Sequence, residues 1–149
     1  IEDFKNPPML LLGGDRINTD RVEQIYKDHS VCNACPVFHT DIMTASMVKY
    51  CINSFLATKV TFMNEMHDVL KAAGGADWRK FVAILAADPR MGASHMQVPG
   101  PDGYYGFGGM CFPKDTTAWA KYAGKLGVQL SVLKYAIKKN VLFRLQKPK

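Results

Sequence analysis

The sequence predicts a mainly α fold, in which shorter helices pack around one long central helix. Residues 41–73 contain no Pro and no Gly, and apolar or small side chains recur there at helical spacing. A Gly- and Pro-rich stretch, residues 88–113, separates this run from two further helical patterns. With 149 residues, 48% of them hydrophobic, the chain can bury an ordinary core without disulfides or metal.

The first elements we expect are a strand and a helix. The segment "PPMLLLGGD" (7–15) reads as a short buried strand closed by a glycine turn. The segment "NTDRVEQIYKDHS" (18–30) is typical of an amphipathic helix capped by Thr19 or Asn18. In "VCNACPVFHT" (31–40), strand-like residues are interrupted by Pro36, so we expect a strand or an extended connection.

The long helix follows. About 30 helical residues would extend roughly 45 Å, well beyond the mean globular helix of about 11 to 12 residues. A helix so long and apolar usually spans a domain or packs against a partner's copy. Gly74 and Gly75 end it, and "ADWRKFVAILAAD" (76–88) predicts a shorter helix that ends at Pro89.

The rest of the chain alternates between loop and helix. Residues 88–113 hold six Gly and four Pro, so we expect no core element there, and a loop of this length is usually functional or disordered. Its aromatic residues argue against disorder. A helix then starts at Pro113 or Asp115, and Gly127 separates it from a last helical pattern over 128–145.

Composition excludes several classes of protein. The apolar runs are far shorter than the roughly 20 residues of a membrane span, and no secretion-signal pattern opens the chain. The net charge is +6, and residues 116–149 carry eight Lys or Arg and no acid. These lysines are spaced through an apolar helical pattern, which favours a solvated helix face over a nucleic-acid arm. We therefore expect neither a nucleic-acid nor a membrane partner.

The four cysteines show no evident disulfide framework. Cys32 and Cys35 form a CxxC followed by His39, which is compatible with a redox dithiol or part of a metal site. Zinc needs four ligands, and no second CxxC or close His pair is present, although the remote His67 or His95 stays open as a partner. We favour packing cysteines, no metal, and a reducing, cytoplasmic location.

The segment "GYYGFGGMCFPKD" (103–115) carries the strongest signal for chemistry. Its glycines would let the backbone approach a ligand closely, although a tight structural turn is an equal alternative. It lacks the GxGxxG spacing of a dinucleotide fingerprint. Cys111 follows these glycines and precedes a helix N-terminus, whose positive end favours the thiolate. A nucleophilic Cys111 and a packing Cys111 both remain open at this point.

Two polar residues of the long helix, Lys49 and Asn53, are four positions apart and share a face. An inward-facing lysine is costly unless it meets a partner or a ligand. The alternative is a helix edge, where both side chains reach water.

Three segments together resemble a known family. "MVKYCINSFLATKVTFMNE" (47–65), "DPRMG" (88–92) and "GFGGMCFPKD" (106–115) are similar to the central domain of the UDP-glucose/GDP-mannose dehydrogenase family. The resemblance runs from about Lys5 to Lys139. It implies that residues 1–39 end an N-terminal α/β dinucleotide-binding domain, of which the strand-helix unit is a remnant. Residues 40–149 would form the central helical domain that dimerises and carries the catalytic cysteine.

The resemblance also implies an activity. Family members oxidise the 6-hydroxymethyl group of a nucleotide sugar to a carboxylate in two NAD-dependent hydride transfers, and UDP-glucose is our first choice of substrate. Cys111 would hold the substrate as a thiohemiacetal and then a thioester. Lys49 and Asn53 would stabilise the oxyanion, and Asp115 would position the hydrolytic water.

By the same resemblance, Lys114 lies beside NAD. The backbone of Tyr105, Gly106, Phe107 and Gly108 lines the sugar nucleotide, and Arg90 reaches the substrate of a neighbouring subunit. The long helix would form the core of a homodimer.

The chain also departs from the family pattern. The glycine fingerprint of the N-terminal domain and the C-terminal nucleotide-binding domain are both missing, and Ser46 stands where an acid is frequent. We therefore expect a central-domain fragment that does not turn over substrate by itself. The alternatives are a non-catalytic helical dimerisation module and a nucleic-acid binder acting through the basic tail. The motifs do not distinguish UDP-glucose from UDP-N-acetylmannosamine or GDP-mannose.

Overall fold

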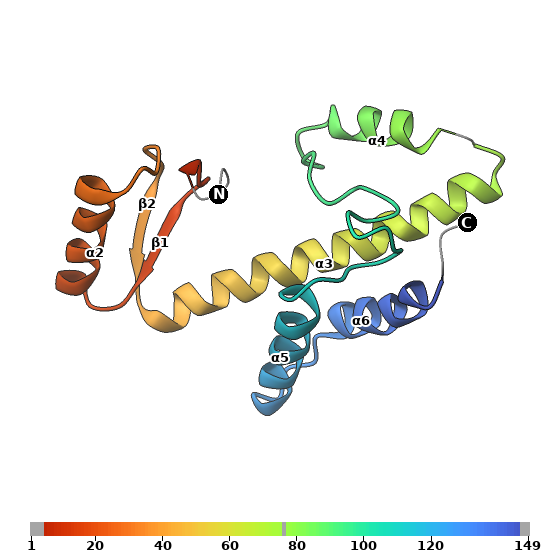
Figure 1. Ribbon diagram of the computed structural model, residues 1–149. Helices are drawn as coiled ribbons and strands as arrows, with labels where there is room; N and C mark the ends of the chain where they lie inside the picture. The colour runs from red at the N-terminus through yellow and green to blue at the C-terminus, as the bar shows by residue number, and fades with distance from the viewer. Residues whose placement is uncertain (1–4, 76, 147–149) are drawn as a thin grey trace. The chain divides into compact units, whose positions relative to one another are not determined.

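The structure is a computed structural model that describes residues 5–75 and 77–146 (Figure 1). Five helices and one two-stranded sheet form within these residues, so the predicted mainly α fold is confirmed. The chain divides into two compact units, Ile1–Lys49 and Tyr50–Lys149, with the boundary inside the long helix. The assignment of residues 1–39 to the end of a dinucleotide-binding domain stays a prediction.

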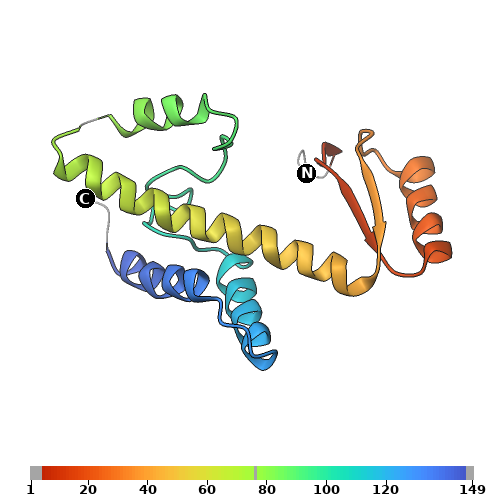
Figure 2. The ribbon, with the colours of Figure 1, turned by 180° about the vertical axis from the view of Figure 1, so that it is seen from behind.

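The N-terminal unit is a β-α-β arrangement. Strand β1 (Leu10–Gly13) pairs in parallel with β2 (Val37–Thr40), with Leu10 opposite Val37 and Leu12 opposite His39. Helix α2 (Arg16–His29) connects the strands and covers one face of the small sheet, as both views show (Figures 1 and 2). Because β1 is only half-buried, the predicted buried strand is confirmed as a strand but not as a core strand.

The predicted caps of α2 are wrong. The helix begins at Arg16 after Asp15, whose carbonyl oxygen accepts hydrogen bonds from the amides of Asn18 and Thr19, both at 3.0 Å. The first turn is therefore already closed where a cap was expected. Thr19 is instead buried, and its hydroxyl donates to the carbonyl of Arg16 at 3.0 Å.

The long helix is confirmed as α3 (Ile42–Ala72), 31 residues. Asp41 caps it, because its carboxylate accepts hydrogen bonds from the amide of Thr44 at 2.9 Å and the hydroxyl of Thr44 at 2.6 Å. These bonds lower the pKa of Asp41. At the other end, Gly74 takes φ 78°, a left-handed conformation that ends the helix as predicted.

The C-terminal unit adds helices α4 (Trp78–Ala86), α5 (Phe112–Lys125) and α6 (Ser131–Arg144) to the larger part of α3. Residues 87–111 form neither helix nor strand, as expected. However, Met96 and Val98 of this loop are buried with Met63 of α3 and form the centre of a core cluster. The stretch therefore supplies side chains to the core although, as expected, it contains no core helix or strand.

Candidate functional site

Cys111 occupies the N-cap of α5, and Pro113 lies in the first turn. Its thiol is exposed and free. The amide of Asp115 donates to the carbonyl oxygen of Cys111 at 2.8 Å, which closes the first turn. The expectation that the cysteine stands at a helix N-terminus is confirmed, and it is not a buried packing residue.

One turn later, the side chain of Asp115 is fully buried, at 0% exposure. The amide nitrogen of Asn53, 62 residues earlier on α3, donates to Asp115 Oδ2 at 2.7 Å. The ammonium of Lys114 pairs with the other carboxylate oxygen. Burying a carboxylate is costly unless it is paired and hydrogen-bonded. The fold therefore brings two of the four residues predicted to be catalytic into direct contact, in the turn that starts at Cys111.

Lys49 lies one helical turn before Asn53 on α3, so the two share a face of this helix. Its side chain is exposed in this chain, which agrees with the helix-edge alternative and not with an inward-facing lysine. Its catalytic role stays a prediction.

Lys114, the residue predicted to lie beside NAD, is 64% exposed at its side chain. The hydrogen bond to Asp115 is the largest cause of its raised pKa, and the nearby charge of that carboxylate adds to it. A positive charge thus lies three residues after Cys111, in the turn that starts at this cysteine.

The glycine loop, residues 102–109, forms one wall of a pocket of about 400 Å³ within the C-terminal unit. Three of the four residues predicted to line a sugar nucleotide, Gly106, Phe107 and Gly108, line this pocket. Tyr105 does not. It lines a separate pocket together with His67 and Trp78.

One further residue, His95, lines the pocket of the glycine loop, and the sequence suggested it only as a remote partner of the CxxC motif. It has φ 62°, a conformation that non-glycine residues rarely adopt and that is often found at functional sites. Its ring lies 5.6 Å from that of Phe112, the residue after Cys111. Burial, and secondarily the charge of Lys59, lower the pKa of His95, which favours the neutral ring. A single histidine in an irregular loop has no periodic pattern that would reveal it.

Arg90, predicted to reach a neighbouring subunit, is held by Asp88. Its guanidinium donates from Nη2 at 2.6 Å and from Nε at 3.0 Å to the two oxygens of this carboxylate. The same turn is fastened to α3, because the ammonium of Lys59 donates to the carbonyl oxygens of Met91 at 2.8 Å and Gly92 at 2.9 Å. The motif "DPRMG" is thus a well-anchored turn, and the intersubunit role of Arg90 stays a prediction.

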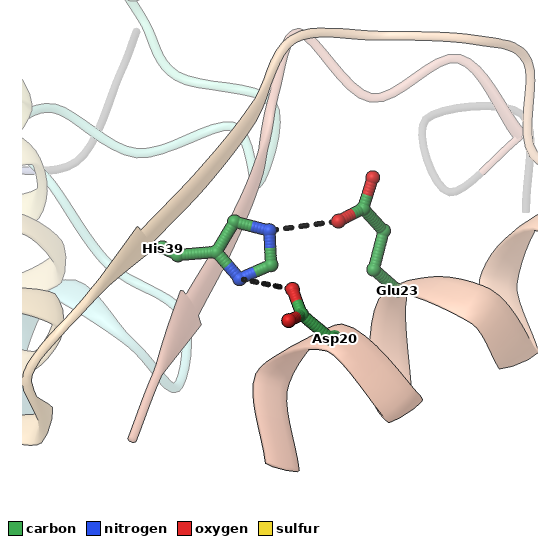
Figure 3. Close-up of side chains that lie close together, drawn as sticks. All are labelled: Asp20, Glu23 and His39. Atoms are coloured by element: carbon green, nitrogen blue, oxygen red, sulfur yellow. Dashed lines mark hydrogen bonds and ion pairs between the residues drawn. The ribbon is translucent and has the colours of Figure 1, made fainter. Parts of the chain in front are cut away.

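In the N-terminal unit, Asp20, Glu23 and His39 bring ligand-type atoms within 4.8 Å of one another (Figure 3). His39 Nε2 lies 2.7 Å from Glu23 Oε2, and Nδ1 lies 2.8 Å from the hydroxyl of Thr19. Both carboxylates also have cationic partners, Arg16 for Asp20 and Lys27 for Glu23. The ring of His39 therefore fastens β2 to α2 instead of extending the CxxC motif. The side chains of Cys32 and Cys35 are both half-buried.

The family model described as "UDP-glucose/GDP-mannose dehydrogenase family, central domain" matches residues 43–141. The chain belongs to this family. Its matched part contains residues 47–65, 88–92 and 106–115, the three segments that carried the resemblance in the sequence.

Individual relatives agree with this assignment. The chain is 31% identical over 139 residues to the UDP-glucose 6-dehydrogenase YwqF of Bacillus subtilis, covering 93% of the chain and 29% of that protein. It is 34% identical over 142 residues to a GDP-mannose 6-dehydrogenase of Pseudomonas syringae pv. syringae, covering 94% of the chain and 30% of that protein. The chain therefore spans less than a third of the length of these relatives.

The fold agrees as well. A solved UDP-glucose dehydrogenase from the hyperthermophilic archaeon Pyrobaculum islandicum superposes with a TM-score of 0.80 at 31% identity, covering 95% of this chain and 31% of that one. Among the residues that the structure describes, no helix has the length and apolar character needed to cross a membrane.

Proposed function

We propose that the chain is the central part of an NAD-dependent nucleotide-sugar 6-dehydrogenase that oxidises UDP-glucose to UDP-glucuronate. The observation that carries the proposal is the contact between Asn53 and the buried Asp115, in the helical turn that begins at the exposed Cys111. A nucleophile at a helix N-terminus, beside a polar pair and a glycine-lined pocket, suits covalent catalysis on a carbonyl group.

In the proposed reaction, the sulfur of Cys111 adds to the aldehyde that the first oxidation produces, and a C–S bond forms. A hydride leaves the carbon of this thiohemiacetal and a proton leaves its hydroxyl group, so that a thioester forms. Water then attacks the thioester carbon, and the C–S bond breaks to release the carboxylate and the thiol. Asp115 orients this water, while Asn53 and Lys49 donate to the oxyanion.

NAD+ supplies the hydride acceptor, one molecule for each of the two oxidations. One feature of the chain fits a nearby dinucleotide: Lys114 presents an exposed ammonium, with a raised pKa, immediately before Asp115. The glycine loop lacks a dinucleotide fingerprint. We therefore assign most of the NAD site to parts of the complete enzyme outside this chain, and we expect no NADH formation from the chain alone.

We also propose a homodimer through α3. Four apolar side chains on this helix are well exposed within the C-terminal unit: Ile52 at 40%, Phe55 at 67%, Phe62 at 48% and Val69 at 59%. We call them the α3 stripe. Phe55, Phe62 and Val69 follow one another at intervals of seven, the spacing of helices that pair along their length. A cytoplasmic location, and the absence of nucleic-acid and membrane partners, stay predictions.

The test uses the complete protein that contains this chain, supplied with NAD+ and either UDP-glucose or GDP-mannose. We expect mass spectrometry to show UDP-glucuronate, and Cys111→Ser to abolish formation of the acid. Cys51→Ser is the matched control, because Cys51 is also an exposed thiol but lies on α3 outside the site. Unchanged acid formation by the Cys111 variant would refute the proposed chemistry, and oxidation of GDP-mannose alone would refute the choice of substrate.

A further inference from the structure

We propose that Asn64, Asn140 and Arg144 are positioning residues, which fix the glycine loop from two helices and so set the wall of the pocket beside Cys111. The link to substrate rests on the proposed function. The fixation of the loop itself rests only on contacts within the C-terminal unit.

Asn140, on α6, pairs with the backbone of Phe107 on both sides. Its Oδ1 accepts from the Phe107 amide at 2.6 Å, and its Nδ2 donates to the Phe107 carbonyl oxygen at 2.9 Å. Asn140 is only 7% exposed, so water does not compete for these bonds. The side-chain amide of Asn140 thus uses its acceptor and its donor on one residue. These two bonds together fix the orientation of the Phe107 backbone.

Asn64, on α3, holds the preceding residue. Its Oδ1 accepts from the Gly106 amide at 3.0 Å, and its Nδ2 donates to the carbonyl oxygen of Val60 at 2.8 Å, within its own helix. Asn64 is 1% exposed. Two consecutive amides of the loop are thus bound by two side chains from different helices.

Arg144 lies one turn after Asn140 on α6 and holds the start of the loop. Its guanidinium donates from Nη1 to Asp102 Oδ2 at 2.7 Å and lies 4.8 Å from the centre of the Tyr104 ring. The three side chains together contact the loop at Asp102, Tyr104, Gly106 and Phe107.

The glycines of the loop fit this arrangement closely. A Cβ on Gly106 would collide with Asn140 Oδ1, and a Cβ on Gly108 would lie 2.7 Å from Asp102 Oδ2 and 3.0 Å from the Arg144 guanidinium carbon. The sequence left open whether these glycines serve a ligand or a tight turn. The contacts show that Gly106 and Gly108 are needed for the close approach of Asn140 and Arg144.

The fixed segment also leads to the site. Gly106, Phe107 and Gly108 line the pocket, and the rings of Phe107 and Phe112 meet edge to face, with their centres 6.3 Å apart. Phe112 follows Cys111 directly. A displacement of Phe107 would therefore change both the pocket wall and the neighbour of the nucleophile.

The first experiment measures amide hydrogen exchange by NMR in the 149-residue chain. The readout is the protection of the Phe107 amide relative to that of Ala123, which is buried in α5. We expect Asn140→Ala to lower this ratio at least about tenfold, because the amide loses its acceptor. Leu133→Ala is the matched control: Leu133 is equally buried on α6, and its loss lowers stability generally without changing the ratio. An unchanged ratio in Asn140→Ala would overturn the proposal.

Asn140→Asp adds a pH-dependent readout, which would not be expected if Asn140 acted only by packing against the loop. At neutral pH its carboxylate still accepts from the Phe107 amide, but the second oxygen now repels the Phe107 carbonyl. Protonation restores a donor there. We expect the protection ratio to be low at neutral pH and to recover as the pH falls, whereas Asn140→Ala shows no recovery. The charged neighbours, Arg144 with Asp102 and Lys139 with Glu65, are already paired. Identical pH profiles for the two variants would contradict the two-sided role of the amide.

The second experiment tests positioning in the complete enzyme. Asn140→Ala should lower kcat/KM for the nucleotide sugar about tenfold or more, because a small misplacement of a binding wall is costly to catalysis. The KM for NAD+ should not change, and neither should any constant of Leu133→Ala. If the wild-type enzyme oxidises neither sugar, the proposed function fails and the exchange ratios alone decide the role of Asn140. An active enzyme with unchanged kcat/KM in Asn140→Ala would overturn the positioning role.

Discussion

Asp115 shows how single residues can make a buried charge tolerable. The carboxylate is fully buried, yet an amide from α3 and the ammonium of the preceding residue occupy its two oxygens. Each partner alone would leave an acceptor without a donor, at a cost of about 1–3 kcal/mol. Cys111, Lys114 and Asp115 all come from one helical turn, so the bond from Asn53 links all three residues to α3.

A glycine can be required because of its backbone conformation or because another side chain approaches it closely. Comparison of Gly106 with Gly109 separates these two requirements. Both have φ near 75°, where an added Cβ costs about 1–2 kcal/mol. A Cβ on Gly109 meets nothing within 4 Å, whereas one on Gly106 meets Asn140 and lies 3.1 Å from the Phe143 Cβ. We expect Gly109→Ala to lower the free energy of unfolding by about 1–2 kcal/mol and Gly106→Ala by roughly 1–3 kcal/mol more. Urea denaturation measures both, and equal losses would mean that the loop moves freely away from α6.

At the scale of elements, periodicity predicted the helices well and the caps poorly. The apolar spacing of α3 and the glycines after it predicted an element of 31 residues almost to the residue. The N-terminus of α2 was misplaced because Thr19, a good cap by type, is used by β2 through His39 instead. This contact of Thr19 depends on His39, 20 residues later in the chain, and a local sequence pattern carries no information about it.

In the candidate site, too, the sequence predicted the local features but not the long-range contacts. The helix N-terminus at Cys111 is a local feature, and the sequence predicted it. The bond from Asn53 to Asp115 spans 62 residues, and the bonds from Asn140 to Phe107 span 33. Only the resemblance to the family suggested that Asn53 and Asp115 belong to one site, and nothing suggested Asn140, which looks like any polar residue of a basic helix. Long-range pairing of this kind depends on how the helices pack.

The link between α2 and β2 should respond to acid. Hydrogen bonds from Lys27, and secondarily from His39, hold the pKa of Glu23 below its usual 4.5. A lowered pKa stabilises the folded unit above pH 4.5, and this contribution is lost as the pH falls through the folded-state pKa. We expect Glu23→Gln to reduce the protection of β2 amides from hydrogen exchange at pH 7, and the difference from wild type to disappear at lower pH. Asp28→Asn, on the same helix but outside the His39 cluster, is the control. A difference that persists undiminished at pH 3 would exclude the carboxylate charge as its cause.

At the scale of the whole molecule, large apolar side chains are exposed on two helices of the C-terminal unit, α3 and α6. Beyond the α3 stripe, helix α6 exposes Val132 and Tyr135, each at 72%. Scattered exposed apolar residues are normal, whereas a row of large ones along one helix indicates a surface that is covered by another protein surface. The α3 stripe and the exposed face of α6 are therefore separate candidates for such a surface. On α3 three exposed residues, Phe55, Phe62 and Val69, recur at intervals of seven, whereas α6 has one such interval, from Tyr135 to Leu142.

This difference leads to a test of assembly. We expect sedimentation velocity to show the 16.6 kDa chain at twice its mass, and the double substitution of Phe55→Asp with Phe62→Asp to give a monomer. Two buried charges facing each other across a paired helix would be too costly to keep the dimer. Tyr135→Asp on α6 is the matched control, because it also places a charge at an exposed aromatic position, and it should remain dimeric. Circular dichroism confirms that each variant is folded. A dimer that survives the α3 substitutions but dissociates with Tyr135→Asp would place the interface on α6 instead of the long helix.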